Sequence, residues 1–293
     1  MLPDFGLIVL GLALARVTGW SPAFWEAIER LTYHVLFPAL LFYANARARI
    51  DLGAAAPLLA VVVAALASGM LLALAARAAL RPPPAVFAGA FQCAFRFNSY
   101  IGLALAGRLY GEAGVALMAL VIGVCVPLVN VAAVWALAAQ SRGGVLRGLA
   151  TNPLLLASAA GVAWGALALP LPDPAQVMLA RIGNASLALG LIAVGAALRF
   201  ELPRHEAAFA GAILAIKLAA VPAVAWALGL AAGLSATALG VAVAFAALPA
   251  ASSAYILTVR MGGDGRTVAI LLSLGTALGI VTLPLWLALV APR

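Results

Sequence analysis

The sequence predicts an all-α membrane protein with ten transmembrane helices, arranged as two inverted five-helix repeats in which helices four and nine are broken and cross. Three observations lead to this fold class. Of 293 residues, 66% are hydrophobic and only 9% are charged. The apolar residues form long runs without the alternation typical of a β-barrel, and a spanning helix needs about 20 of them. Finally, short polar motifs recur in the two halves.

Apolar runs bounded by charged residues, proline and glycine mark the expected spans. They lie at about 3–19, 31–48, 53–79, 84–108, 112–139, 152–170, 183–200, 205–231, 235–260 and 265–291.

The arginines predict how these spans are oriented. If the N-terminus is outside, ten arginines lie at cytoplasmic ends: Arg16, Arg30, Arg77, Arg81, Arg142, Arg147, Arg199, Arg204, Arg260 and Arg266. Five lie at outer ends: Arg47, Arg49, Arg108, Arg181 and Arg293. Basic residues favour the cytoplasmic side, so we expect both termini in the periplasm of a bacterial inner (cell) membrane. The net charge of +8 marks span ends rather than one basic tract, which argues against a nucleic-acid partner.

Two landmarks recur in order. "RIDL" (49–52) ends the second span and "RFEL" (199–202) ends the seventh, while "LYGEAG" (109–114) and "MGGDGR" (261–266) close the fourth and ninth. Five spans per half is an odd number, so equivalent spans run in opposite directions, as in many secondary transporters. We therefore expect a first repeat over 1–139, a cytoplasmic linker over 140–151 and a second repeat over 152–293.

The fourth span carries a charge at its centre. Arg96 lies twelve residues from either end of Pro84–Arg108, about 18 Å along a helix. A charge near the bilayer midplane costs at least ~2.5–3.5 kcal/mol, so Arg96 must face protein or a wet cavity. Asn98, Ser99 and Tyr100 follow it and complete a candidate substrate site. The alternative is a structural arginine bonded to backbone carbonyls.

The ninth span is interrupted at the equivalent place. Pro249 corresponds to Phe97 and should break the helix near Leu248, since proline lacks a backbone donor and clashes with the preceding turn. The hydroxyl-bearing residues that follow are Ser252, Ser253 and Tyr255. A simple kink is the alternative. Two interrupted spans in equivalent positions indicate a binding site, and half-helix N-termini there suit an anion.

Four motifs resemble the auxin efflux carrier family of bacteria and plants. They are "HVLFPALLFYAN" (34–45), "FRFNSYIGLALAGRLYGEAG" (95–114), "KLAAVP" (217–222) and "LPAASSAYILTVRMGGDG" (248–265). The resemblance implies two five-helix inverted repeats with spans four and nine crossing. It also implies a scaffold of spans 1, 2, 6 and 7, against which spans 3–5 and 8–10 move as an elevator.

The same resemblance places Pro38 beside the substrate path, and Asn45 is a further candidate for lining it. Ala104 stands where the family often has proline, so the break in span four is expected to rely on Asn98, Gly102 and Gly107.

The charges suggest the substrate class. All nine acidic residues lie at span ends or in loops, whereas Lys217 lies about thirteen residues into span eight, at the depth of Arg96. Two buried cations repel each other, and an anion relieves that repulsion. For Lys217 four roles stay open: a substrate contact, a proton carrier, an occupant of the place where a related carrier binds sodium, or a structural tie to the carbonyls of a broken helix.

The sequence thus predicts a secondary transporter of small organic anions, such as malonate, malate or an auxin-like acid. The alternatives are a sodium- or proton-coupled symporter or antiporter of the same architecture, and a ten-span drug or metabolite exporter. The spans contain no paired acids, metal-ligand set or nucleophile with a base, so we expect no enzyme activity, cofactor or metal. A homodimer is left open.

Overall fold

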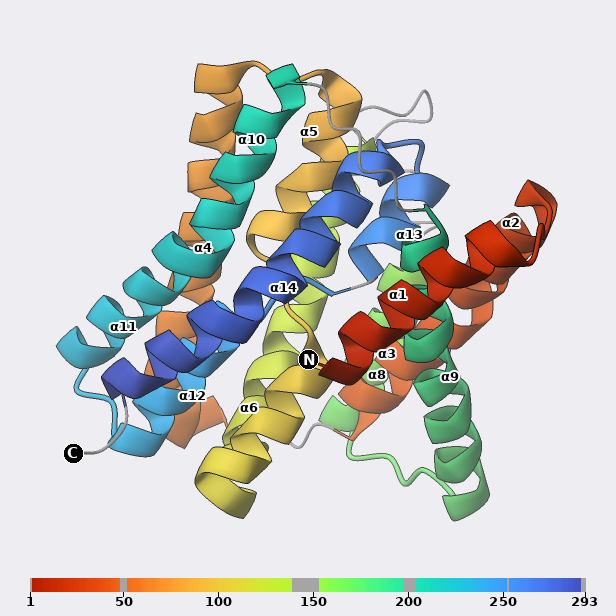
Figure 1. Ribbon diagram of the computed structural model, residues 1–293. Coiled ribbons are helices and arrows are strands. Elements are labelled where there is room, and N and C mark those ends of the chain that lie inside the picture. Colours follow the sequence, from red (N-terminus) through yellow and green to blue (C-terminus); the bar gives the residue numbers. More distant parts are fainter. Residues whose placement is uncertain (1, 48–51, 139–152, 198–203, 252, 291–293) are drawn as a thin grey trace.

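The computed structural model describes residues 2–47, 52–138, 153–197, 204–251 and 253–290, and within these ranges every regular element is a helix (Figure 1). The all-helical prediction is confirmed. Five stretches are long and apolar enough to cross a membrane: 55–80, 120–138, 173–193, 206–231 and 265–290. Two shorter apolar helical stretches cover 84–94 and 236–247.

The helices pack in two groups. The smaller helix group contains α1 (Leu2–Val17), α2 (Pro22–Leu31), the π-helical turn η1 (Thr32–Leu36), α3 (Phe37–Ala46), α8 (Pro153–Ala166) and α9 (Asp173–Ala197). Glycines allow close backbone contacts within it: Gly11 of α1 lies on the backbone of Ile192, and Gly161 of α8 lies on Phe42. A side chain at either glycine would collide with that backbone.

The larger helix group holds the remaining elements. These are α4 (Leu52–Leu80), α5 (Pro84–Phe91), η2 (Gln92–Ala94), α6 (Ser99–Ala138), α10 (Arg204–Ala215), η3 (Ile216–Ala220), α11 (Val221–Ala231), α12 (Ala236–Ala247), α13 (Ser253–Arg260) and α14 (Gly265–Val290). Its core is aromatic and aliphatic, with Phe87, Phe91, Phe209 and Phe245 fully buried. The two groups meet where α8 contacts α6, and where α9 contacts α13 and α14.

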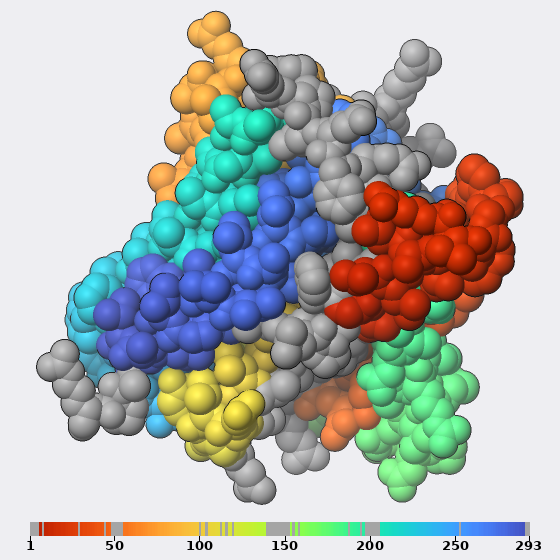
Figure 2. Space-filling model, viewed as in Figure 1, coloured from red at the N-terminus to blue at the C-terminus, as the bar shows by residue number. Residues whose placement is uncertain are grey.

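The outer face of α14 is apolar. Its surface runs across the face seen in Figure 2, and Val281, Leu285 and Leu289 are each about 60% exposed. Exposed aliphatic side chains in a row on a helix of this length are suited to lipid rather than water.

Two helices begin about ten residues earlier than the apolar runs indicated. The second span was expected from residue 31 and the seventh from residue 183, whereas α2 begins at Pro22 and α9 at Asp173. The reason is that polar residues interrupt both starts. In α2, Glu26 and Arg30 pair at 2.7 Å, and the rings of Phe24 and Trp25 meet edge to face. A search for uninterrupted apolar runs passes over such a segment.

Helix boundaries recur between the two halves of the chain. Helix α5 begins at Pro84 and α12 at Ala236, 152 positions apart, which is also the separation of Phe97 and Pro249. The two glycine motifs also match, because Gly111 interrupts α6 with φ 61° and Gly262, two residues after the end of α13, has φ 78°. This positive φ is readily adopted by glycine. The ten-span inverted arrangement itself stays a prediction.

Candidate binding site at the crossing of two broken helices

The first break separates α5 and η2 from α6. Helical structure ends at Ala94 and resumes at Ser99, so residues 95–98 form a non-helical segment at the centre of the expected fourth span. Asn98 caps the new helix: its Oδ1 accepts a hydrogen bond from the Ile101 N–H at 3.3 Å, as an N-cap side chain does.

The expectation that Gly102 and Gly107 help to make this break is wrong, because both lie inside helical α6. The cap at Asn98 is enough to restart the helix. Gly102 serves packing instead: a Cβ there would lie 2.9 Å from Cδ1 of Leu248, in the second break.

The second break lies where the proline predicts it. Helix α12 ends at Ala247, Leu248 is extended (φ −59°, ψ 137°), and α13 begins at Ser253. Pro249 is buried and has no N–H that could continue the helical hydrogen-bond pattern.

The two breaks are in contact. The backbone N–H of Asn98 donates to the carbonyl oxygen of Pro249 at 3.0 Å. Beside this bond the rings of Phe97 and Phe245 pack with centroids 4.2 Å apart. One unwound backbone group of each segment is therefore satisfied by the other, as a membrane interior requires.

Arg96 lies beside this crossing and is only 4% exposed. Its Nη1 donates to Oγ of Ser253 at 2.6 Å, and its Nη2 donates to Oδ1 of Asn130 at 2.8 Å. Both partners are neutral side chains, so the alternative of an arginine tied to backbone carbonyls does not describe these contacts. Nε of Arg96 and Nδ2 of Asn130 are buried donors without a partner in the described part of the chain.

Asn130 was missed by the sequence analysis, although it is an amide in an otherwise apolar run. It is 3% exposed and reaches Arg96 from the later part of α6. Gln92 was also missed. Its Nε2 donates to the Ala254 carbonyl at 3.2 Å and to Oγ1 of Thr258 at 2.8 Å, which joins η2 to α13.

Lys217 lies on the other side of the second break. It projects from η3, is 2% exposed, and its Nζ donates to the Ala246 carbonyl at 2.9 Å. Of the roles left open by the sequence, this contact matches the tie to broken-helix carbonyls.

A family model described as membrane transport protein matches residues 137–287, half of the chain, and this match includes α11, α12, the break at Pro249 and α13. The chain belongs to the auxin efflux carrier family of membrane transport proteins. No curated protein matches it. The break that contains Arg96 and Asn98 precedes the matched part of this auxin efflux carrier family member.

The other predicted site residues of this family member are spread more widely. Ser99 is half-buried at the first position of α6 and Tyr100 is the second. Tyr255 is buried, with its ring beside Gly265 at the start of α14. Asn45 donates to the Leu41 carbonyl at 2.9 Å from α3, in the smaller helix group. Ser252 lies outside the described residues.

The described carboxylates pair away from the crossing. Glu206 lies 3.4 Å from Nη2 of Arg266, and Glu26 pairs with Arg30 and with Arg260. Among the described ion pairs none contains Arg96 or Lys217. The positive charge at Arg96 therefore has no described counter-charge.

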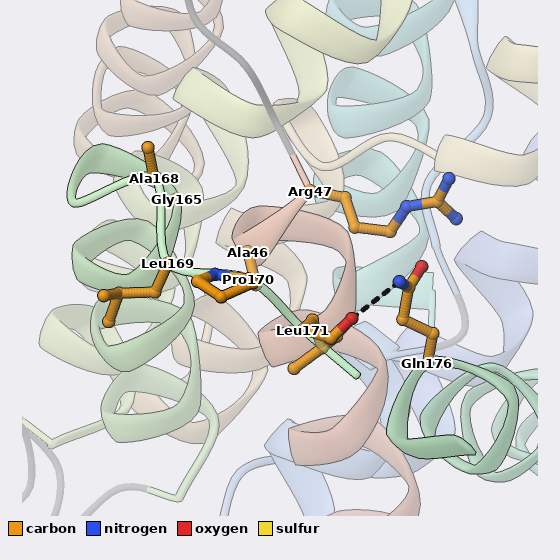
Figure 3. Close-up of a pocket in the computed structure, with 8 residues that line it drawn as sticks. All are labelled: Ala46, Arg47, Gly165, Ala168, Leu169, Pro170, Leu171 and Gln176. Atoms are coloured by element: carbon orange, nitrogen blue, oxygen red, sulfur yellow. Dashed lines mark hydrogen bonds between the residues drawn. The ribbon is translucent and has the colours of Figure 1, made fainter. Parts of the chain in front are cut away.

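The structure also has a pocket of about 780 Å³ at the end of α3 (Figure 3). Its lining residues are Ala46, Arg47, Gly165, Ala168, Leu169, Pro170, Leu171 and Gln176. None of the residues at the crossing lines it. Arg47 there donates to the hydroxyl of Tyr43 at 2.6 Å, and Gln176 donates to the Leu171 carbonyl.

Proposed function

We propose that this carrier is a secondary transporter of small organic anions and binds them at the crossing of the two broken helices. The observation that carries the proposal is the environment of Arg96. Its guanidinium bonds to neutral side chains, and within the described residues two buried donors, Nε of Arg96 and Nδ2 of Asn130, have no partner. Leaving buried donors unsatisfied costs about 1–3 kcal/mol each, and an anion would remove that cost.

A carboxylate fits these donors better than a neutral group. One oxygen would accept from Nε of Arg96 and the other from Nδ2 of Asn130, while Arg96 keeps its bond to Ser253. Charge-assisted bonds of this kind are roughly twice as strong as neutral ones. Helix α13 begins at Ser253, so its partial positive end favours the same ligand.

The remaining candidates extend the site around this anchor. Asn98, Ser99, Tyr100, Pro249, Ser252 and Tyr255 belong to the two broken segments, and Asn45 would line the path from the smaller helix group. The expected substrates are carboxylates such as malonate, malate or an auxin-like acid.

The mechanism we propose is an elevator. The smaller helix group would be the scaffold of spans 1, 2, 6 and 7, and the larger helix group would carry the substrate across. The separate packing of the two groups supports this division. Glycines bring the helices of the smaller group close together, and buried aromatic side chains fill the larger group.

The matching helix boundaries support the two inverted repeats, over 1–139 and 152–293. The arginine distribution supports a bacterial inner membrane with both termini in the periplasm. The linker 140–151 lies outside the described residues.

Thermal stabilisation by a substrate panel tests the proposal, because a ligand of the native state raises its Tm. Purified full-length protein is heated with malonate, malate and indole-3-acetate, and with the matched neutral amides. We expect at least one carboxylate to raise Tm while its amide does not, and Arg96→Ala to lose the shift. The matched control is Arg47→Ala, at the separate pocket, which should keep it.

Equal stabilisation by acids and amides would contradict an anion site and favour a drug or metabolite exporter. Stabilisation that appears only with sodium present would favour a sodium-coupled carrier of the same architecture.

A further inference from the structure

The Lys217 ammonium donates a hydrogen bond to a backbone carbonyl at the C-terminal end of α12. The last carbonyls of an α-helix have no partner within it, and the end carries a partial negative charge. At the end of α12 the Leu248 N–H reaches the Phe245 carbonyl at 3.3 Å, and Nζ of Lys217 reaches the Ala246 carbonyl at 2.9 Å. The next residue, Pro249, has no N–H to offer. The lysine thus supplies a donor where the backbone lacks one.

A local distortion fixes the position of this lysine. Lys217 belongs to the π-helical turn η3, and Pro222 follows at the start of α11. A proline cannot donate to the carbonyl four residues earlier, here that of Leu218. Nε1 of Trp286 donates to the Leu218 carbonyl instead, at 2.9 Å. The distorted turn is therefore held open by a contact with α14.

The contacts of Lys217 favour a structural donor over a substrate anchor. Within the described residues, the Ala246 carbonyl is its only recorded partner, and no carboxylate pairs with it. Broken helices in other transporters use such carbonyl ends to coordinate Na⁺ or H⁺. Arg96 differs, because it bonds Ser253 at the N-terminal, partially positive end of α13.

We propose that the ammonium of Lys217 is a built-in monovalent cation that neutralises the carbonyl end of α12 and holds the second break open, so that no bound metal ion is needed there. Lys217 is therefore a positioning residue. It fixes the backbone of Leu248 and Pro249, and the Asn98 N–H donates to the Pro249 carbonyl. This role of Lys217 does not depend on which substrate the carrier binds.

Thermal unfolding of the full-length protein in detergent tests this, with choline, sodium or propylammonium chloride at equal ionic strength. The wild type should have the same Tm in all three salts. Lys217→Gln, which keeps a neutral N–H donor, should lose several degrees because the charge is missing. Lys217→Ala should also lose several degrees, and propylammonium, which is the group removed, should restore Tm in a concentration-dependent manner.

The matched control is Leu218→Ala, which opens a cavity at the neighbouring buried position without removing a charge. It should lower Tm with no selective recovery in propylammonium. A wild-type Tm for Lys217→Gln would overturn the proposal, as would equal effects of propylammonium on Lys217→Ala and Leu218→Ala. If Lys217→Ala does not survive purification, the comparison of Lys217→Gln with the wild type decides.

Discussion

At the scale of single residues, Arg96 is held by two neutral side chains. A guanidinium has five N–H donors, and those of Nη1 and Nη2 already reach Ser253 and Asn130. Its Nε is buried and has no partner in the described part of the chain. Arg96→Lys should therefore fail to support transport, because a single ammonium cannot reach both partners and still contact the substrate.

The Asn130→Asp variant tests this environment. It places a carboxylate 2.8 Å from Nη2 of Arg96 and removes the unpaired Nδ2 donor. We expect a protein that is more heat-stable than the wild type and no longer stabilised by carboxylates, because the variant carries its own counter-charge. A buried charge left unpaired costs more than one that is paired.

Melting curves with and without the best carboxylate measure both effects. Asn130→Leu serves as the control, since it removes the amide without adding a charge. An Asn130→Asp protein that still gains Tm with the carboxylate would place the anion elsewhere.

Some residues around Arg96 could be predicted from the sequence, and others could not. Arg96, Asn98 and Pro249 could be predicted because a charge, a polar residue or a proline at mid-span is costly in lipid. Asn130 and Gln92 could not be assigned, since their roles depend on which helices meet in space. The crowding of Gly102 against Leu248 likewise depends on tertiary packing.

At the scale of elements, two helices stay broken because each supplies what the other lacks. Asn98 caps α6 and donates to Pro249, whose carbonyl lies just beyond the end of α12. Pro249 predicted the second break, and Asn98, one of the residues on which the first break was expected to rely, is the N-cap of α6. The starts of α2 and α9 were passed over because polar residues interrupt them.

Pro249→Ala should slow transport several-fold without unfolding the protein. Alanine restores the missing N–H and favours helix, so α12 can extend toward α13 and withdraw the carbonyl from Asn98. Initial uptake rates in proteoliposomes measure the loss. Pro222→Ala, at the start of α11, is a control for replacing a proline outside the crossing. An unchanged rate for Pro249→Ala would mean that the break does not depend on the proline.

At the scale of the whole molecule, α6, α13 and α14 of the larger helix group contact the smaller one, and one of these contacts is polar. Arg260 of α13 donates to the Glu26 carbonyl of α2 at 2.7 Å. If the larger helix group moves as an elevator, this contact must break during transport. The division into two groups was implied by family resemblance, because apolar runs alone do not say which helices pack together.

Topology is tested by labelling a single cysteine. Ser141→Cys in a background lacking Cys93 and Cys125 should react from the cytoplasmic side only, since ten arginines against five favour that side for the linker. Labelling by a membrane-impermeant reagent in intact cells would reverse the predicted orientation.

The most direct test is uptake of the best-stabilising carboxylate into proteoliposomes, with wild type and Arg96→Ala compared in sodium-free choline medium under an imposed voltage. The field contributes about 2.3 kcal/mol per charge per 100 mV, so net movement of an anion must respond to it. We predict saturable, sodium-independent uptake by the wild type and at least roughly 30-fold less by Arg96→Ala, which corresponds to the loss of about 2 kcal/mol of binding. Equal uptake by both proteins, or uptake only under an inward sodium gradient, would contradict the account.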